Sequence, residues 1–416
     1  MSSGQQVVIV GAGQAGIGAA AALRESGHLG PVTVIGREGH LPYERPPLSK
    51  AYLTADTVDE SHLALRSAGW YAEHDIDLLL GQDVTGIDRD RHRVTLGSGE
   101  QLPYDHLILA TGTRPRTLPL PGADLRGVGV LRDLRDARVL RGDLAAAGDV
   151  VAIGAGFIGM EFAAAAAKSG SRAVVLDVAP RVMGRAVATA ISRHFTEAHR
   201  SWGNEILLEC GVSELRGDDH GRVTAVVTST GRVLPADTVV IAVGVAPNVE
   251  LGADAGLDVG DGVIVDEYLR TSDPDVSAIG DCASFPEPTS GRRRRLESVQ
   301  CAADHARCVA ARLTGHPAPY SAVPWFWTHQ GELKLQIAGL GDDADTEVVR
   351  GEPGTGRFSV FRYRGDRLLA VDSVNRPADH VAARRLLAAE RHPTPEQIAD
   401  PEFDLRTAAT APALPL

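Results

Sequence analysis

The chain has 416 residues, of which 44% are hydrophobic and 23% charged, a composition typical of a globular protein with two or three domains. Its 42 basic and 54 acidic residues give a net charge of −12, which argues against nucleic acid as the main partner. No stretch approaches the roughly 20 consecutive apolar residues that span a bilayer, and the segment MSSGQQVVIV lacks the basic and apolar regions of a signal peptide. We therefore expect a cytoplasmic protein that does not bind membranes.

The cysteines are scattered along the chain. They are Cys210, Cys282, Cys301 and Cys308, with no Cys-x-x-Cys pair and no metal-like clustering. We expect small packed side chains in a reducing compartment, and we expect no metal site.

Two segments carry the same glycine fingerprint between an apolar run and an Ala-rich helical stretch. The first is VVIVGAGQAGIGAAAALRESG from Val7, and the second is VVAIGAGFIGMEFAAAAAKSG from Val150. The matching glycines are Gly11, Gly13 and Gly16 in the first copy and Gly154, Gly156 and Gly159 in the second. A further apolar strand follows each helix, PVTVIG and RAVVLD, so each copy is a complete strand–helix–strand unit.

The spacing of these glycines suits a dinucleotide. The first glycine permits the tight turn from strand to helix, the second lets the backbone approach a pyrophosphate, and the third lets helix and strand pack closely. The N-terminus of the helix then points at the phosphate groups. Because the whole context occurs twice, the sequence predicts two Rossmann-like dinucleotide-binding domains of the α/β class.

The residues that end the second strand of each unit predict which nucleotide it holds. Asp177 can accept hydrogen bonds from a ribose 2′-hydroxyl and repels a 2′-phosphate, which favours NAD over NADP, although Arg181 follows about one helical turn later. In the first unit, either Glu38 serves the ribose or Arg37 lies over an adenine. The alternative is that both are solvated loop charges.

The order of segments predicts that one module is inserted into the other. YDHLILATGTRPR (104–116) is an apolar strand that breaks at Thr111-Gly112, and ADTVVIAVGVAPN (236–248) repeats the pattern with Gly244. We expect a first module made of 1–118 and 245–322, an inserted second module at 119–244, and a C-terminal α+β domain at 323–416. Within these, VSAIGDCASF (276–285) predicts a strand ending in Gly-Asp before a helix, and the Pro- and Ala-rich tail after His392 predicts poor order.

Six further motifs cover most of the chain: RPPLSKAYL (45–53), ATGTRPR (110–116), AIGDCASF (278–285), LESVQCA (296–302), VPWFWTHQGELKLQIAGL (323–340) and LAVDSVNRP (369–377). In these motifs the chain resembles the FAD-dependent, NADH-using ferredoxin reductases of bacterial oxygenase systems, which belong to the glutathione-reductase-like flavoproteins. The resemblance implies that the first module holds FAD and the inserted module holds NADH. The chain departs from the family at Arg37, where an acid is usual, and at THQGE, where SDQ is common.

The residue patterns and the resemblance together predict which residues bind the cofactors. Those expected at FAD are Gly11, Gly13, Ala15, Gly16, Arg37, Glu38, Arg45, Lys50, Val84, Thr111, Gly112, Arg132, Gly280, Asp281, Val299 and Trp327. Those expected at NADH are Gly154, Gly156, Ile158, Gly159, Glu161, Asp177 and Gly244.

Lys50 and Glu161 are the expected catalytic pair. In the family, the matching residues form an ion pair beside the reactive nitrogen of the flavin, where an ammonium group stabilises the negative charge that hydride brings. Glu161 is expected on the first turn of its helix. The alternative is an exposed loop lysine and a helix N-terminal acid that is favoured by the macrodipole.

Residues 37–53 contain no cysteine where disulfide reductases of the family place a redox-active pair, although Cys282 and Cys301 fall in segments close to the expected flavin site. Without a thiol relay, we expect electrons to pass from FAD directly to a 2Fe–2S ferredoxin that serves a haem-thiolate monooxygenase or a Rieske oxygenase. The run Arg292, Arg293, Arg294 and Arg295 could dock such a partner or could be a solvated loop. Rival functions are a rubredoxin reductase and a nicotinamide-responsive flavoprotein with little turnover.

Overall fold

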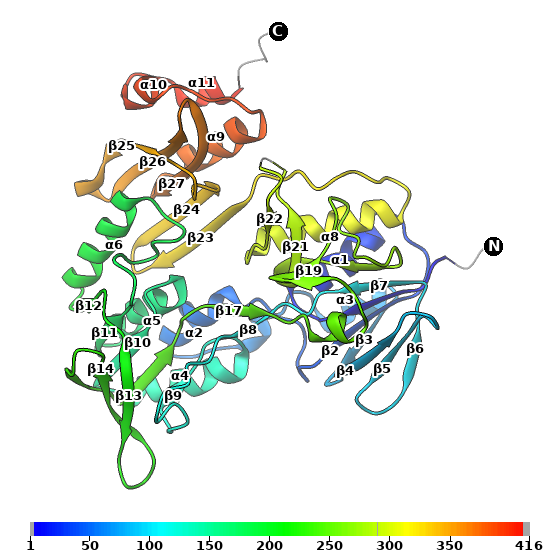
Figure 1. Ribbon diagram of the computed structural model, residues 1–416, viewed down its shortest axis with the longest axis horizontal. Helices are drawn as coiled ribbons and strands as arrows, with labels where there is room; N and C mark the ends of the chain where they lie inside the picture. The colour runs from blue at the N-terminus through cyan, green and yellow to red at the C-terminus, as the bar shows by residue number, and fades with distance from the viewer. Residues whose placement is uncertain (1–3, 289, 411–416) are drawn as a thin grey trace. The chain divides into compact units, whose positions relative to one another are not determined.

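A computed structural model describes residues 4–288 and 290–410 (Figure 1). The chain divides into two compact units. The first unit consists of Met1–Glu44, Asp59–Arg114 and Val245–Ala322, and the second of Arg45–Val58, Pro115–Gly244 and Val323–Leu416. The mixed α/β class expected from the sequence is confirmed, because each unit contains a parallel sheet with helices.

The units differ from the expected module boundaries in one segment. Arg45–Val58 was expected in the first module but belongs to the second unit, because Leu53 packs into the same core as Leu140 and Leu144. The expected starts at 245 and 323 coincide with unit boundaries, and the second unit begins at Pro115 rather than at 119.

The first unit is built on a parallel sheet in the order β20–β7–β1–β2–β3. These strands are Val276–Ala278, His106–Leu109, Val7–Val10, Val32–Gly36 and Ile76–Leu80. The runs VVIV and HLIL are buried throughout, as expected for strands covered on both faces. Helices α1 (Gln14–Glu25) and α8 (Val299–Leu313) pack against each other through small residues.

The rest of the first unit consists of short elements around this sheet. They are α3 (Ala68–Glu73), β4 (Val84–Asp88), β5 (Arg93–Leu96), β6 (Gln101–Pro103), β8 (Thr113–Pro115), β17 (Val245–Pro247), α7 (Glu250–Asp254), β18 (Val259–Gly260), β19 (Gly262–Ile264), β21 (Ala283–Pro286) and β22 (Arg293–Arg294). The expectation that a helix follows Gly280-Asp281 was wrong. Gly280–Cys282 is a single 3₁₀ turn that leads into β21, and the helix begins only at Val299, where the Ser298 side chain accepts from the Cys301 amide.

The second unit contains a parallel sheet in the order β12–β11–β10–β16–β9. These strands are Glu205–Leu207, Arg172–Leu176, Asp149–Ile153, Thr238–Ile241 and Val128–Gly129. Around it lie α2 (Ala51–Thr54), α4 (Leu134–Ala146), α5 (Phe157–Lys168), α6 (Thr189–Ser201), β13 (Val212–Gly217), β14 (Val223–Thr228) and β15 (Val233–Pro235). A 3₁₀ turn, η1 (Pro46–Ser49), precedes α2.

The same unit carries an antiparallel sheet in the order β23–β24–β27–β26–β25 (Figure 1). The strands are Trp325–Gln330, Leu333–Gly339, Arg367–Val374, Arg357–Arg364 and Thr346–Glu352, followed by α9 (Pro377–Ala388), α10 (Pro395–Ala399) and α11 (Leu405–Thr410). The expectation of poor order after His392 was wrong for the residues up to Thr410. Ile398 and Leu405 are buried, and the Tyr363 hydroxyl donates to the Pro393 carbonyl oxygen at 2.7 Å. Residues 411–416 lie outside the described part.

Candidate active site

The first glycine fingerprint has the geometry that the sequence predicts. Gly11 has a φ of +116°, and a Cβ atom at Gly16 would lie 1.8 Å from the Gly11 carbonyl oxygen. Gly13 is the N-cap of α1, and among the described residues a Cβ atom there would meet no heavy atom within 4 Å. The turn is therefore tight where helix and strand meet and open at the helix N-terminus, which fits a pyrophosphate.

The second fingerprint repeats this arrangement at the N-terminus of α5. Gly154 has a φ of +110°, and a Cβ atom at Gly159 would lie 1.9 Å from the Gly154 carbonyl oxygen. Gly156 is the N-cap and faces open space among the described residues. The neighbouring Ile158 is 38% exposed, although its side chain is large and apolar.

Asp177 lies at the carboxyl end of β11, beside the second turn. Its Oδ2 oxygen accepts from the Ala155 amide at 2.6 Å and its Oδ1 oxygen from the Ala179 amide at 2.8 Å. Arg181, the nearby cation, donates instead to the Val187 carbonyl oxygen at 2.7 Å and to Ser192 Oγ at 3.0 Å. A carboxylate held at this corner can accept from a ribose hydroxyl and disfavours a phosphate.

The corresponding corner of the first unit is less defined. The Arg37 side chain is exposed, and Glu38 Oε2 accepts from the Tyr43 hydroxyl at 2.6 Å. The choice between these residues as the adenosine contact stays a prediction.

The segments after β7 and β20 meet the first fingerprint at one edge of the sheet. A Cβ atom at Gly280 would lie 2.8 Å from Ala15 Cβ, so the Gly280 turn touches the start of α1. Asp281 Oδ2 accepts from the Thr113 hydroxyl at 3.3 Å, and the Gly280 amide donates to His305 Nδ1 at 3.2 Å. Carboxyl ends of neighbouring parallel strands are where nucleotides bind, so this edge fits FAD.

Other expected FAD residues of the first unit lie in the surrounding segments. Thr111 Oγ1 donates to the Asn248 carbonyl oxygen at 2.7 Å, which fixes the Thr111-Gly112 break. Val84 begins β4 and Val299 begins α8, and both are half-buried. His305 is a contact that sequence reasoning missed, because only the fold brings α8 under the Gly280 turn.

Lys50 and Glu161 form an ion pair in the second unit. The distance from Lys50 Nζ to Glu161 Oε2 is 2.8 Å, and the side chains are 20% and 3% exposed. Glu161 is the fifth residue of α5, so its expected place on the first turn was wrong and the macrodipole does not explain it. The buried contact contradicts the alternative of an exposed loop lysine.

Hydroxyl groups complete the surroundings of the Glu161 carboxylate. Ser49 donates to Oε2, and Thr328 on β23 donates to Oε1 at 2.5 Å. Sequence reasoning missed both. Ser49 adjoins Lys50 in the RPPLSK motif and could have been found there, whereas nothing local marks Thr328.

Other predicted residues of the second unit lie in separate segments. Arg45 Nη1 donates to the Arg132 carbonyl oxygen at 2.9 Å. The Trp327 ring lies 5.4 Å from the Trp325 ring, in a half-buried aromatic stretch of β23. Gly244 follows β16 with a φ of +98°.

Comparison with known proteins decides the family. A model of the pyridine nucleotide-disulphide oxidoreductase family matches residues 5–306, and a reductase C-terminal model matches residues 325–409. The chain is 51% identical to rhodocoxin reductase of Rhodococcus erythropolis over 97% of this chain and 94% of that protein, and 40% identical to putidaredoxin reductase of Pseudomonas putida over 98% and 97%.

Solved structures agree. A ferredoxin reductase for the CYP199A2 system of Rhodopseudomonas palustris matches with a TM-score of 0.96 and 46% identity, covering 98% of this chain and 100% of that one. The covalent putidaredoxin reductase–putidaredoxin complex matches with a TM-score of 0.94 and 40% identity, covering 98% of both chains.

The chain belongs to the pyridine nucleotide-disulphide oxidoreductase family. As a family member resembling ferredoxin reductases, it is an oxidoreductase whose cofactors are FAD and NAD(H). The open N-termini of α1 and α5 fit the two pyrophosphates.

Two of the four cysteines are buried, as expected for packed side chains, whereas Cys210 and Cys308 are half-buried. Cys282 and Cys301 are fully buried, and burial raises the pKa of both thiols. Cys301 Sγ lies 3.4 Å from His305 Nε2. The described residues contain no disulfide and no group of His, Cys, Asp or Glu side chains that could hold a metal ion.

The arginine run 292–295 is only partly a surface feature. The Arg295 side chain is 8% exposed and pairs with Asp261 and Glu297 at 3.1 and 2.7 Å. Arg293 Nη1 donates to the Val265 and Ser284 carbonyl oxygens at 2.9 and 3.0 Å. Neither alternative, a docking charge or a solvated loop charge, holds for Arg295, whose side chain is nearly buried and paired with carboxylates.

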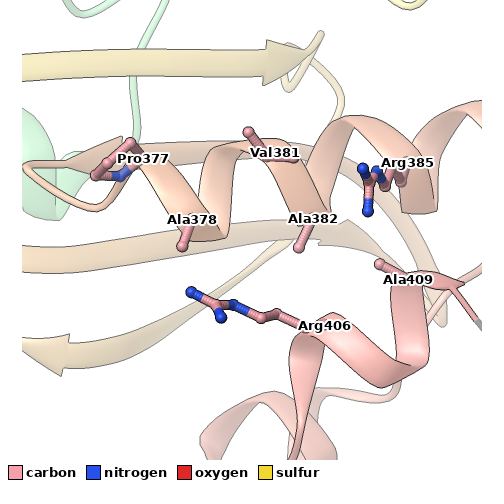
Figure 2. Close-up of a pocket in the computed structure, with 7 residues that line it drawn as sticks. All are labelled: Pro377, Ala378, Val381, Ala382, Arg385, Arg406 and Ala409. Atoms are coloured by element: carbon pink, nitrogen blue, oxygen red, sulfur yellow. The ribbon is translucent and has the colours of Figure 1, made fainter.

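A groove lies elsewhere, between α9 and α11 (Figure 2). It has a volume of about 360 Å³ and is lined by Pro377, Ala378, Val381, Ala382, Arg385, Arg406 and Ala409. It contains none of the predicted site residues. Within the part of the chain that the structure describes, no helix has the length and apolarity to cross a membrane.

Proposed function

We propose that this enzyme oxidises NADH, transfers the hydride to FAD, and passes the electrons singly to a 2Fe–2S ferredoxin of an oxygenase system. The single observation that carries the proposal is the ion pair between Lys50, which precedes α2, and the buried Glu161 of α5, the helix that we propose binds the nicotinamide nucleotide. The relatives support the acceptor, since they include rhodocoxin and putidaredoxin reductases and the reductase component of an anthranilate 1,2-dioxygenase system.

FAD, when bound, accepts a hydride and releases its electrons one at a time. The role of this chain is to hold a positive charge where negative charge develops. Lys50 Nζ pairs with the Glu161 carboxylate, which is itself held by the Ser49 and Thr328 hydroxyls. Because the Glu161 side chain is nearly buried, water screens the interaction between Lys50 and Glu161 little.

Asp177 is proposed to select NADH over NADPH. Its carboxylate is fixed by two backbone amides and therefore cannot turn away from a 2′-phosphate. The like charges would repel each other at this half-buried corner.

The acceptor is proposed to be an iron–sulfur protein because residues 37–53 contain no cysteine to relay electrons through a disulfide. The exposed residues Arg292 and Arg293 remain candidates for steering an acidic partner. A cytoplasmic location is part of the proposal, supported by four cysteines that form no disulfide in the described residues.

The experiment is a reduction assay with the FAD-loaded protein. NADH and NADPH are compared with a panel of 2Fe–2S ferredoxins, and a rubredoxin serves as the alternative carrier. We expect NADH to be the better donor and a 2Fe–2S ferredoxin the better acceptor. A preference for rubredoxin, or no reduction of any carrier, would contradict the proposal.

A further inference from the structure

Glu161 is the last acceptor in a buried chain of polar side chains. Thr328 Oγ1 donates to Glu161 Oε1 at 2.5 Å, and Gln330 Nε2 donates to Thr328 Oγ1 at 3.3 Å. Beyond them, His199 Nε2 lies 2.9 Å from Gln330 Oε1, and Asn204 Nδ2 lies 3.1 Å from His199 Nδ1. None of these five residues is more than 4% exposed, so bulk water does not compete for their hydrogen bonds.

These residues come from separate elements of the second unit. Thr328 and Gln330 alternate along β23, so their side chains share one face of the sheet, and β23 packs against α5, which carries Glu161 (Figure 1). His199 lies in the last turn of α6, and Asn204 precedes β12. The chain of hydrogen bonds therefore joins the antiparallel sheet to the nucleotide-binding helix.

The charge of Glu161 sets the direction of the first hydrogen bonds. A carboxylate paired with Lys50 has no proton to donate, so the hydroxyl proton of Thr328 points at Glu161. Thr328 must then accept from the amide nitrogen of Gln330. The amide oxygen of Gln330 consequently faces His199.

His199 continues the same direction. Its Nε2 atom carries the proton that Gln330 Oε1 accepts. Burial lowers the pKa of His199 to about 4, so the ring is neutral at physiological pH and Nδ1 accepts from Asn204. Asn204 Nδ2 also donates to the Ala163 carbonyl oxygen of α5 at 3.3 Å, which anchors the far end.

We define the relay as Thr328, Gln330, His199 and Asn204. We propose that the relay fixes the Glu161 carboxylate against Lys50 and thereby sets the rate at which FAD is reduced by NADH. This inference rests on the proposed function and assigns positioning residues, which act on the reaction through Glu161. Each hydrogen bond from one relay residue to the next is donated towards the carboxylate, and hydrogen bonds aligned in this way strengthen one another.

The direct test removes the hydroxyl of Thr328 while keeping the shape of its side chain. Thr328→Val lacks the donor to Glu161 Oε1, whereas Thr328→Ser retains it. Rapid mixing of the FAD-loaded protein with NADH without oxygen gives the limiting rate of flavin reduction and the dissociation constant of NADH separately. We expect Thr328→Val to lower the limiting rate about tenfold with little change in the dissociation constant, and Thr328→Ser to restore most of the rate.

Thr228→Val is the matched control. Thr228 is a buried threonine on β14 in the same unit, where its hydroxyl contacts Thr230 Oγ1 at 2.9 Å and accepts from the Arg232 amide at 3.0 Å. It has no part in the relay, so we expect the wild-type rate. FAD content and melting temperature, measured for every variant, separate a slow folded protein from an unfolded one.

A relay also predicts coupling between distant positions. His199→Phe removes the donor to Gln330 and should lower the limiting rate about threefold, less than Thr328→Val, because it acts through intervening groups. If both residues act through one chain, the double variant is no slower than Thr328→Val. A wild-type rate in Thr328→Val, or fully additive effects, would overturn the relay. A wild-type protein that is reduced by NADH but reduces no carrier protein would contradict the proposed function instead. In that case the rates of flavin reduction in the variants and the wild type could still be compared, so the relay would still be tested.

Discussion

The two nucleotide-binding turns have the same backbone and differ in the side chains next to it. The second copy follows the first at a constant offset of 143 residues, from Gly11 to Gly154, so Gly18 corresponds to Glu161. A Cβ atom at Gly18 would lie 3.4 Å from Ala306 Cβ, so this position faces α8. The matching position on α5 instead holds a buried carboxylate that pairs with Lys50.

The ends of the second strands differ in the same way. Ile35 of β2 pairs with Val10, and Leu176 of β11 pairs with Ile153 at the matching position of the second unit, so Gly36 corresponds to Asp177. A Cβ atom at Gly36 would lie 2.7 Å from Ala12 Cβ, which leaves no room for a side chain. Asp177 in the second unit occupies that corner with a carboxylate. We therefore expect the fingerprint to provide the phosphate-binding turn and the neighbouring positions to provide the chemistry.

The largest expected effect comes from the part that the two turns share. Gly159→Ala would place a Cβ atom 1.9 Å from the Gly154 carbonyl oxygen, and we expect reduction by NADH to slow about a hundredfold or more because the turn must shift. Gly16→Ala should instead impair FAD retention, which absorbance of the purified protein measures. Gly142→Ala, within α4 and facing open space among the described residues, should change neither property. Loss of FAD in Gly159→Ala would break the assignment of the two turns.

The next effect comes from the charge pair that only the second turn carries. We expect Lys50→Ala to keep the fold and FAD but to slow flavin reduction about a hundredfold, because no ammonium then stabilises the developing negative charge. Lys168→Ala, at the exposed end of the same helix α5, is the control. Rapid-mixing rates in Lys50→Ala equal to those of the wild type would refute this role.

A smaller effect is expected at the ribose corner. Asp177→Ala should lower the rate of flavin reduction by NADH about tenfold, because the acceptor for the ribose 2′-hydroxyl is lost. The rate with NADPH relative to NADH should rise, because the repulsion between the carboxylate and the 2′-phosphate is removed. Asp218→Ala removes another aspartate of this unit that accepts from backbone amides, those of His220 and Arg222, and should leave the preference unchanged. An unaltered ratio of NADH to NADPH rates in Asp177→Ala would place the ribose elsewhere.

The smallest effect concerns stability and the antiparallel sheet of the second unit. Asp372 is fully buried, and burial raises its pKa from 3.8 to about 6. The folded state therefore binds a proton that the unfolded state releases, so stability falls as pH rises from about 4 to about 6, by roughly 3 kcal/mol. The free energy of unfolding, measured with urea across this pH range, should fall with pH in the wild type and fall less steeply in Asp372→Asn. Identical slopes would contradict the assignment.

The residues that the sequence predicted and those it missed differ in how they are encoded. The glycines follow from local spacing that the chain repeats, so one unit checks the other, and Asp177 follows from its place at the end of a strand in its own unit. Thr328 contacts Glu161 across 167 residues of sequence, and only the packing of β23 on α5 reveals it. Arg295 looked like surface charge because its partner Asp261 lies on another segment.

The error in the C-terminal tail has a different origin. Its Pro and Ala content suggested poor order, but Thr394 and Gln397 form a reciprocal cap at the start of α10. That signal is local and was available in the sequence. Composition was therefore a weaker guide there than capping chemistry.

The most direct test of the account is an anaerobic titration of the FAD-loaded protein with NADH, followed by the visible absorbance of the flavin. The account predicts that one equivalent of NADH per FAD completes the reduction, since no thiol pair shares the electrons. Consumption of a second equivalent before the flavin is fully reduced would reveal a further redox centre and contradict direct transfer from flavin to acceptor.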